Sequence, residues 1–377
     1  MSAWPGKYVI GLTGNIATGK SVVRRMLEHL GAHGIDADAL AHRAIARDAP
    51  GYKPVLKTFG TWILDGDGEI DRARLAQLVF GDRQALERLE AIIHPLVRGA
   101  IDILVGRSNH KVFVIEAIKL LEGPLHQACD SVWVTIAPQE LQLERLMKNR
   151  GLSEELALQR ISAQSPQEVK AASADVVIHN TGSFEETWRQ VQAAWNRVLP
   201  EVYKERGAAE VSRRGIPLVE RASPRQAEEI AAFITRLSKG RRKLSREDIM
   251  AAFSDKAYLV LKVDGRMAGL AGWQVENLVA RTSDIYLEPG LILGDAMRVL
   301  MEAIERASHE LQCEALLLFL PPHLARHSSL WSVLGYEARA PQDLGVSAWV
   351  EAALESMPIG TVMFFKQLRK DRVLRPI

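Results

Sequence analysis

The hydrophobic pattern of the first two hundred residues alternates between short apolar runs and longer amphipathic stretches. The run Lys7–Thr13 is apolar and β-branched, and we expect it to form a buried strand. It leads into a glycine-bearing turn, Gly14–Gly19, and then into a stretch of helical periodicity that begins at Lys20. Gly31 ends this stretch, as a C-terminal glycine ends many helices. The order predicts a strand, a loop and a helix in succession.

Further strands are expected in this half of the chain. A second strand ends near Ile35, and stronger or weaker strand patterns cover Lys111–Ile115, Ser131–Ile136 and Asp175–Ile178. Strands that alternate with helices predict a mostly parallel sheet with helices on both faces. The fold class of this half is therefore α/β.

The pattern changes near residues 200–214, where charged and small residues follow one another without an apolar period. We place a linker at 201–215, between a first domain of residues 1–200 and a second domain of residues 216–377. Asp264-Gly265 separates two strand patterns of the second domain, which is a strong hairpin signal. We expect an α+β domain with an antiparallel core. Its helices would cover Pro224–Leu237, Ser245–Phe253 and Asp295–Leu311, and its strands Ala257–Val263, Met267–Gln274, Asp284–Leu287, Ala315–Phe319 and Thr361–Phe365.

Composition and charge narrow the function without identifying it. Charged residues make up 25% of the 377 residues, and the formal net charge is only +2, so we expect neither nucleic acid nor a membrane surface as a partner. No stretch reaches the ~20 apolar residues of a membrane span. Cys129 and Cys313 lack metal-site or CxxC spacing, which favours a reducing compartment and hence the cytoplasm. Oligomeric state is not accessible from these features.

The first chemical signal is a P-loop pattern of glycine, four residues and Gly-Lys-Ser. It is formed by Gly14, Asn15, Ile16, Ala17, Thr18, Gly19, Lys20 and Ser21. The loop lies between an expected strand and an expected helix, so its N–H groups and the helix N-terminus would both face a phosphate. We expect ATP here, with Lys20 at the β- and γ-phosphates and the Ser21 hydroxyl on Mg²⁺. A chance glycine-rich turn is the alternative.

Two carboxylates follow the second expected strand, at the sheet edge where α/β proteins bind ligands. Asp36 and Asp38 come directly after Gly34-Ile35 and would face the phosphates. An aspartate here can accept the proton of an acceptor hydroxyl, or it can cap the helix that follows. Both roles can coexist.

Five segments resemble dephospho-CoA kinases in the order of that family: GLTGNIATGKS, GIDADALAH, IIHP, VIEAIKLLE and ADVVIHNTG. The resemblance covers about residues 8–195. It implies a P-loop kinase with a helical lid that transfers the γ-phosphoryl of ATP to the 3′-hydroxyl of dephospho-CoA, the last step of coenzyme A biosynthesis. Another P-loop small-molecule or nucleotide kinase, and a sensor of CoA or nucleotides without turnover, are the alternatives.

The resemblance also implies roles for individual residues. Asp38 would be the catalytic base, and Asp36 would help to hold Mg²⁺ or the acceptor. Arg145 and Arg150 would lie on the lid and reach the transferring phosphoryl, although the family usually has its second lid arginine one position earlier, at Asn149. A solvated helix face is the alternative for both arginines.

Three more residues would bind ligands by the same resemblance. Asn180 and Gly182 would lie beside the adenine, although Asn and Gly are also ordinary turn residues. His94 is a candidate on the substrate side, with a helix boundary at His94-Pro95 as the alternative. The chain departs from the family's Pro-Leu-Leu-Phe-Glu run at Ile118 and Lys119, which concerns the entrance for the pantetheine arm.

The C-terminal segment, about residues 217–368, resembles GNAT-type N-acetyltransferases in the order of its elements and in LGYEA at Leu334–Ala338. That resemblance implies acetyl-CoA or CoA as a ligand, held by an Arg/Gln-x-x-Gly-x-Gly/Ala loop. Here the loop is Glu288–Asp295, and Asp295 places a negative charge where phosphates would bind. An inactive domain, an acetyltransferase and a CoA sensor all stay open. Because every residue assigned to phosphoryl transfer precedes this segment, we expect residues 1 to about 205 to be active alone.

Overall fold

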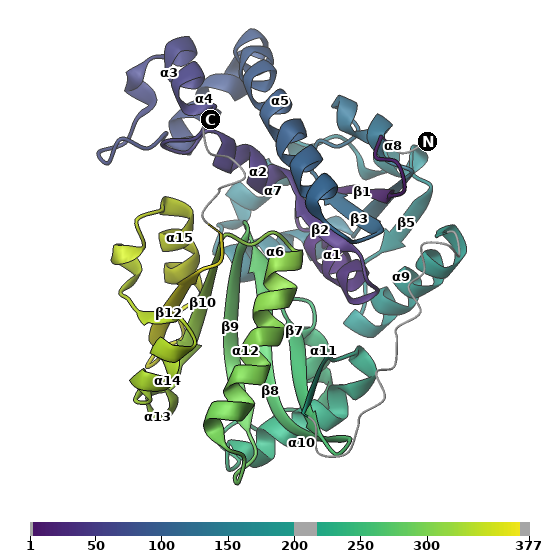
Figure 1. Cartoon of the computed structure of the whole chain (residues 1–377). Helices are drawn as coiled ribbons and strands as arrows, with labels where there is room; N and C mark the ends of the chain where they lie inside the picture. The colour runs from purple at the N-terminus through teal and green to yellow at the C-terminus, as the bar shows by residue number, and fades with distance from the viewer. Residues whose placement is uncertain (1–2, 200–216, 370–377) are drawn as a thin grey trace.

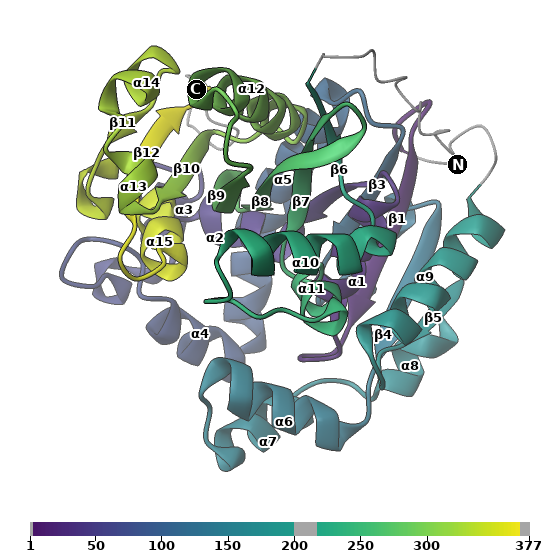
Figure 2. The same cartoon turned by 90° about the horizontal axis from the view of Figure 1, so that it is seen from below.

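The computed structural model describes residues 3–199 and 217–369, apart from the side chains of Phe80, Asn149 and Arg150. We call residues 3–199 the N-terminal part and residues 217–369 the C-terminal part. Each part has one sheet with its own helices, and the two parts lie against each other (Figure 1 and Figure 2). The expected linker lies outside the described residues. None of the described helices has the length and apolar character needed to cross a membrane.

The N-terminal sheet has five strands in the order β2-β3-β1-β4-β5, and every neighbouring pair is parallel. This confirms the expected α/β fold class and each strand expected in this part. The strands are β1 (Tyr8–Gly14), β2 (His33–Asp36), β3 (Val112–Glu116), β4 (Ser131–Ile136) and β5 (Val176–His179). The helices are α1 (Lys20–His29), α2 (Ala37–Ala44), α3 (Tyr52–Phe59), η1 (Thr61–Ile63), α4 (Arg72–Gly81), α5 (Arg83–Arg107), η2 (Pro124–Ala128), α6 (Gln139–Arg150), α7 (Glu154–Ser162), α8 (Gln167–Ala172) and α9 (Phe184–Val198).

Helices cover both faces of this sheet because alternate strand side chains point to opposite faces. On β1, Val9 lies in a core with Ile101 of α5, whereas Ile10 lies in a core with Met26 of α1 and Val191 of α9. All five side chains are at most 1% exposed. Because all five strands are parallel, their carboxyl ends lie at one edge of the sheet, where the loops after β1, β2 and β3 come together.

The C-terminal sheet has seven strands in the order β11-β12-β10-β9-β8-β7-β6. The expected antiparallel core is confirmed except at β9 and β10, which pair in parallel because helix α12 carries the chain back between them. The strands are β6 (Leu218–Arg221), β7 (Ala257–Val263), β8 (Arg266–Glu276), β9 (Val279–Leu287), β10 (Ala315–Leu320), β11 (Glu337–Ala338) and β12 (Val362–Gln367). The helices are η4 (Pro224–Gln226), α10 (Ala227–Leu237), α11 (Arg246–Ala252), α12 (Leu293–Glu310), α13 (Pro322–Ala325), α14 (Ser328–Val333), η5 (Pro341–Leu344) and α15 (Ser347–Ser356).

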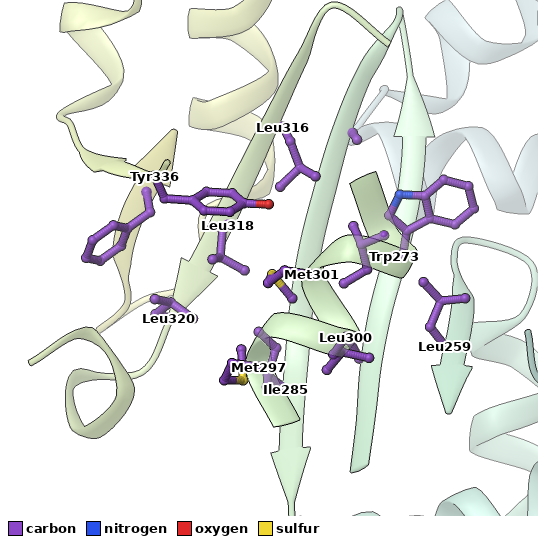
Figure 3. Packing of buried hydrophobic residues seen from close by; sticks show 14 of the residues in the cluster. Leu259, Trp273, Ile285, Met297, Leu300, Met301, Leu316, Leu318, Leu320 and Tyr336 are labelled. Atoms are coloured by element: carbon purple, nitrogen blue, oxygen red, sulfur yellow. The ribbon is translucent and has the colours of Figure 1, made fainter. Parts of the chain in front are cut away.

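Helix α12 packs on this sheet through a dense apolar cluster (Figure 3). Leu300 and Met301 of α12 meet Leu316 of β10 and Trp273 of β8 in this cluster. Burying each such side chain contributes roughly 1.5–3 kcal/mol. Tyr336 belongs to the same cluster, is 2% exposed and donates a hydrogen bond to Glu305, which accounts for it as a packing residue.

Candidate active site

The P-loop occupies the connection between β1 and α1 that the pattern predicts. Gly19 precedes α1 with a left-handed φ of 92°, and Ala17 has a φ of 59°. Gly14 and Gly19 are required by close packing as well as by backbone conformation. A Cβ atom at Gly14 would lie 2.4 Å from the carbonyl oxygen of Thr135, and one at Gly19 would lie 1.8 Å from the side-chain nitrogen of Asn180.

Lys20 lies folded over this loop. Its side chain is largely buried, and Nζ donates hydrogen bonds to the carbonyl oxygens of Gly14 and Asn15, at 3.0 and 3.1 Å. The segment after α7 braces the loop from outside, since the N–H of Ile16 donates to Oε1 of Gln164 at 2.6 Å. The ammonium group is thus placed where an anion bound by the loop would sit.

Ser21 shares a carboxylate with an arginine that sequence reasoning did not single out. Oγ of Ser21 donates to Glu116 Oε1 at 2.9 Å, and Nε of Arg24 donates to Glu116 Oε2 at 2.7 Å. Glu116 is the last residue of β3 and is 5% exposed. The signal was available, because a carboxylate that ends the strand beside β1 must lie at the same sheet edge as the P-loop.

Mg²⁺ at sites that bind phosphate substrates is held by oxygen ligands, and the neighbouring Ser21 hydroxyl and Glu116 carboxylate are ligands of this kind. Within residues 3–199 and 217–369, no group of three or more His, Cys, Asp and Glu side chains is arranged to hold a metal. Mg²⁺ bound through phosphate oxygens needs only one or two protein carboxylates. Ser21 and Glu116 meet that requirement.

The two aspartates after β2 have different surroundings. Asp36 caps α2, since its Oδ1 accepts the N–H of Ala39 at 2.8 Å, so the capping alternative is confirmed for one of its oxygens. Asp38 does not cap; its Oδ2 accepts the N–H of Ile118 at 3.0 Å. Burial raises the pKa of Asp38 to about 6, against the lowering effect of the Ile118 hydrogen bond and with a further increase from Asp36.

Asp38 opens onto a mostly apolar cavity of about 290 Å³ between α2, α5 and the segment after β3. His94 of α5 lies on its wall, together with Lys119, which pairs with Glu90 at 3.2 Å. The apolar walls come from Ala37, Ala41, Leu89, Ile93, Val97, Leu120 and Leu125. His94-Pro95 is not a helix boundary, because α5 runs from Arg83 through Pro95 to Arg107.

The lid arginine that we expected reaches the P-loop. Arg145 lies on α6 and donates to the carbonyl oxygens of Ala17 and Asn180, at 3.1 and 3.0 Å. Partial burial lowers the pKa of its guanidinium. Arg150 is the last residue of α6, and its side chain lies outside the described residues.

Asn180 and Gly182 follow β5, where their roles are largely local. Asn180 is buried, donates to the carbonyl oxygen of Thr18 at 3.0 Å and accepts from Thr187 at 3.1 Å, so its side chain supports the P-loop. A Cβ atom at Gly182 would lie 1.7 Å from Oε2 of Glu186, in the capping box that starts α9. An adenine contact at these residues stays a prediction.

A second, larger cleft of about 1620 Å³ is lined by both parts of the chain. Ser21 and Asp36 reach it from the N-terminal part, and Asp284 reaches it from β9. Asp284 contacts Arg242 and Lys256, so these three charges are paired with one another. Its rim includes Glu288, which pairs with Arg236, while Asp295 follows in the first turn of α12 and pairs with Arg298.

The chain resembles known proteins over each of its parts. A family model described as dephospho-CoA kinase matches residues 8–186. The dephospho-CoA kinase of Geobacter sulfurreducens is 43% identical over 195 residues, which cover 51% of this chain and 99% of the relative.

Two solved structures illustrate the two parts. A Thermus thermophilus protein is 35% identical and covers 52% of this chain and 99% of its own, with a TM-score of 0.47. A GNAT-family acetyltransferase of Staphylococcus aureus is 13% identical and covers 41% of this chain and 100% of its own, with a TM-score of 0.33.

Proposed function

Because this chain belongs to the dephospho-CoA kinase family, we propose that its P-loop, Asp38 and apolar cavity together phosphorylate the 3′-hydroxyl of dephospho-CoA with ATP. The observation that carries this proposal is the place of Asp38. Its carboxylate lies between the Lys20 side of the P-loop and the 290 Å³ cavity. A hydroxyl group of a substrate in that cavity would meet the base and the phosphates at one point.

The P-loop would hold the phosphates of ATP through its N–H groups and the N-terminus of α1. Lys20 would leave the loop carbonyls for the β- and γ-phosphates, and Arg145 would turn its guanidinium from Ala17 toward the same anion. Ser21 and Glu116 would hold Mg²⁺, which supplies positive charge to the β- and γ-oxygens. Phosphoryl transfer depends mainly on such positioning and charge compensation.

Asp38 would take the proton of the acceptor hydroxyl. With a pKa of about 6, it is mostly ionised near neutral pH and remains basic enough to accept a proton. The Ile118 N–H fixes one carboxylate oxygen, and this leaves the other oxygen for the substrate. The apolar wall of the cavity would accommodate the pantetheine arm, with His94 and Lys119 at polar positions.

A coupled assay of ADP release tests the function directly. The chain is given ATP and Mg²⁺ with dephospho-CoA, AMP, CMP or pantothenate as acceptor, and we expect turnover with dephospho-CoA. Preference for AMP or CMP would instead indicate a nucleotide kinase. Binding of ATP without turnover on any acceptor would favour the sensor.

We also propose a division into a kinase domain at 1–200, a linker at 201–215 and a second domain at 216–377. For the second domain we favour a structural or regulatory role over acetyl transfer. Asp295 lies in the first turn of α12, where its carboxylate would compete with a pyrophosphate for the helix N-terminus. The free thiols of Cys129 and Cys313 support a cytoplasmic location.

A further inference from the structure

The turn between β8 and β9 inserts into the N-terminal part. Leu278 in this turn is 9% exposed and belongs to the same core as Ile35 of β2 and Ala37 and Leu40 of α2. The core that supports helix α2 is therefore completed by a side chain from the other part of the chain.

The backbone conformation at Leu278 indicates that the buried contact of the side chain, and not the geometry of the turn, explains why a leucine lies here. The two central residues of the turn, Asn277 and Leu278, have φ values of 51° and 61°. Turns with two such residues favour Asn, Asp and Gly, and the Asp264-Gly265 turn of the neighbouring hairpin follows that preference. A leucine with positive φ costs backbone strain, so its place is explained by the contact that its side chain makes.

An ion pair fixes α2 to the same turn. Arg43, near the end of α2, donates to Glu314 Oε2 at 2.6 Å and to the carbonyl oxygen of Asn277 at 2.7 Å. The side chains of Arg43 and Glu314 are 7% and 0% exposed. The N–H of Glu314 donates to the carbonyl oxygen of Leu278 at 2.7 Å, which ties the acid to the turn.

Helix α2 is short and carries the proposed base. It has eight residues, begins after the cap Asp36 and holds Asp38 in its first turn. Leu278 supports the core beneath its start, and Arg43 fixes its last turn to the C-terminal part. A shift of the helix would move Asp38 relative to the P-loop, which lies on a different element. Displacements of about 1 Å can lower turnover by 10²-fold.

We infer that the C-terminal part, through Leu278 and the Arg43–Glu314 pair, positions helix α2 and its carboxylate for phosphoryl transfer. This inference rests on the proposed function. Leu278 and Glu314 are positioning residues, since they act through α2 and touch no reacting atom.

The test is Leu278→Gly in the full chain. Glycine suits the positive φ, so the turn is relieved of strain while the docked side chain is lost. We expect kcat for dephospho-CoA to fall at least tenfold, with KM for ATP within twofold of wild type, because the P-loop is not part of α2. Leu278→Met keeps an apolar side chain and should therefore retain most of the wild-type kcat.

Two controls separate positioning from general damage. Val191→Ala removes buried apolar volume from the opposite face of the sheet. Even if it lowers Tm as much as Leu278→Gly does, its kcat should stay within twofold of wild type. Arg246→Ala breaks the exposed pair with Glu185, which joins the two parts away from α2, and should also keep kcat. If either control lowered kcat as much as Leu278→Gly, a positioning role would be overturned.

A double variant, Arg43→Met with Glu314→Met, removes the pair without leaving one buried charge. We expect the same pattern of lowered kcat and unchanged KM for ATP. If the wild type is active and both Leu278→Gly and the double variant have the wild-type kcat, the inference is overturned and the kinase function stands. An inactive wild type would overturn the function and this inference with it.

Discussion

The backbone N–H of Ile118 donates a hydrogen bond to the Oδ2 atom of Asp38 across 3.0 Å. The peptide is held in place on its other side, because the carbonyl oxygen of Ile118 accepts from Thr13 and Lys170 at 3.0 and 2.8 Å. The Pro-Leu-Leu-Phe-Glu run that this segment resembles would place a proline here, and a proline has no N–H to donate. This chain therefore gives its proposed base a donor that a proline would not supply.

Ile118→Pro should raise the pKa of Asp38, because the lost hydrogen bond stabilises the charged carboxylate. As the pH is lowered, the rate would then begin to fall at a higher pH, and the acid limb of the kcat profile would move upward from near pH 6. Ile118→Ala keeps the N–H and serves as the control, with an unchanged profile. A profile that moves equally in both variants would contradict this account.

Asp38→Asn should lower kcat by ~10² or more, since an amide cannot take the acceptor's proton. The wild type should lose activity as pH falls through about 6, where Asp38 becomes protonated. Asp36, Lys20 and Glu116 also face this carboxylate, so the limb is assigned to Asp38 only if the variant lacks it. A change confined to KM for ATP would place Asp38 at the nucleotide instead.

Lys20→Ala should abolish phosphoryl transfer, because no other side chain in the loop supplies a cation to the β- and γ-phosphates. The thermal unfolding midpoint should stay close to that of wild type, since the hydrogen bonds that Nζ donates to the carbonyl oxygens of Gly14 and Asn15 lie within the loop. Steady-state ADP release and a thermal melt check both points. Unchanged turnover would rule out this nucleotide site.

Glu116→Gln should weaken Mg²⁺ use, because the carboxylate beside the Ser21 hydroxyl loses its charge. We expect the Mg²⁺ concentration for half-maximal rate to rise about tenfold, an effect of ~1.4 kcal/mol. Glu122→Gln is the matched control, since Glu122 is half-exposed and pairs with Lys170. Equal Mg²⁺ dependence in wild type and Glu116→Gln would remove Glu116 from the metal site.

His29 should make the fold sensitive to mild acid. Burial lowers its pKa to about 3, whereas an unfolded histidine has a pKa near 6.5. As pH falls below about 6.5, the unfolded chain binds a proton that the folded chain does not. Stability is therefore lost between about 6.5 and 3, by up to ~1.4 kcal/mol per pH unit.

Urea unfolding at pH 7 and pH 5.5 measures this loss. His33 is buried with the same direction of shift, so His29→Gln should reduce the pH dependence without removing it. A variant with the full wild-type dependence would show that His29 does not contribute. Because His29 contacts the carbonyl oxygen of Phe253 at 3.1 Å, the protonation acts at the boundary between the two parts.

The predictable features were the local ones. The strand at Ser131–Ile136 and the P-loop could be placed because each is encoded in consecutive residues. The parallel pairing of β9 with β10 was missed, since an antiparallel pattern and a parallel one look alike in short apolar strands. The link between Ser21 and Glu116 joins residues 95 positions apart, and no local pattern reports such a distance.

The expectation that residues 1 to about 205 suffice for activity followed from the same limit. It counted the residues at the reacting centre and could not see what holds them. Leu278 resembles an ordinary apolar residue in the sequence, and only its positive φ and its place beside Leu40 show what it does. That expectation stays a prediction, and the positioning role inferred for the C-terminal part argues against it.

The Arg43–Glu314 pair also has a consequence for how the chain comes apart. If one part unfolded while the other stayed folded, a buried guanidinium or a buried carboxylate would lose the counter-charge that this pair supplies. Unpaired charges are costly to leave in an apolar setting, so a half-folded chain is an unfavourable species. Melting should then be a single cooperative transition, with both sheets lost together and little population of either one alone.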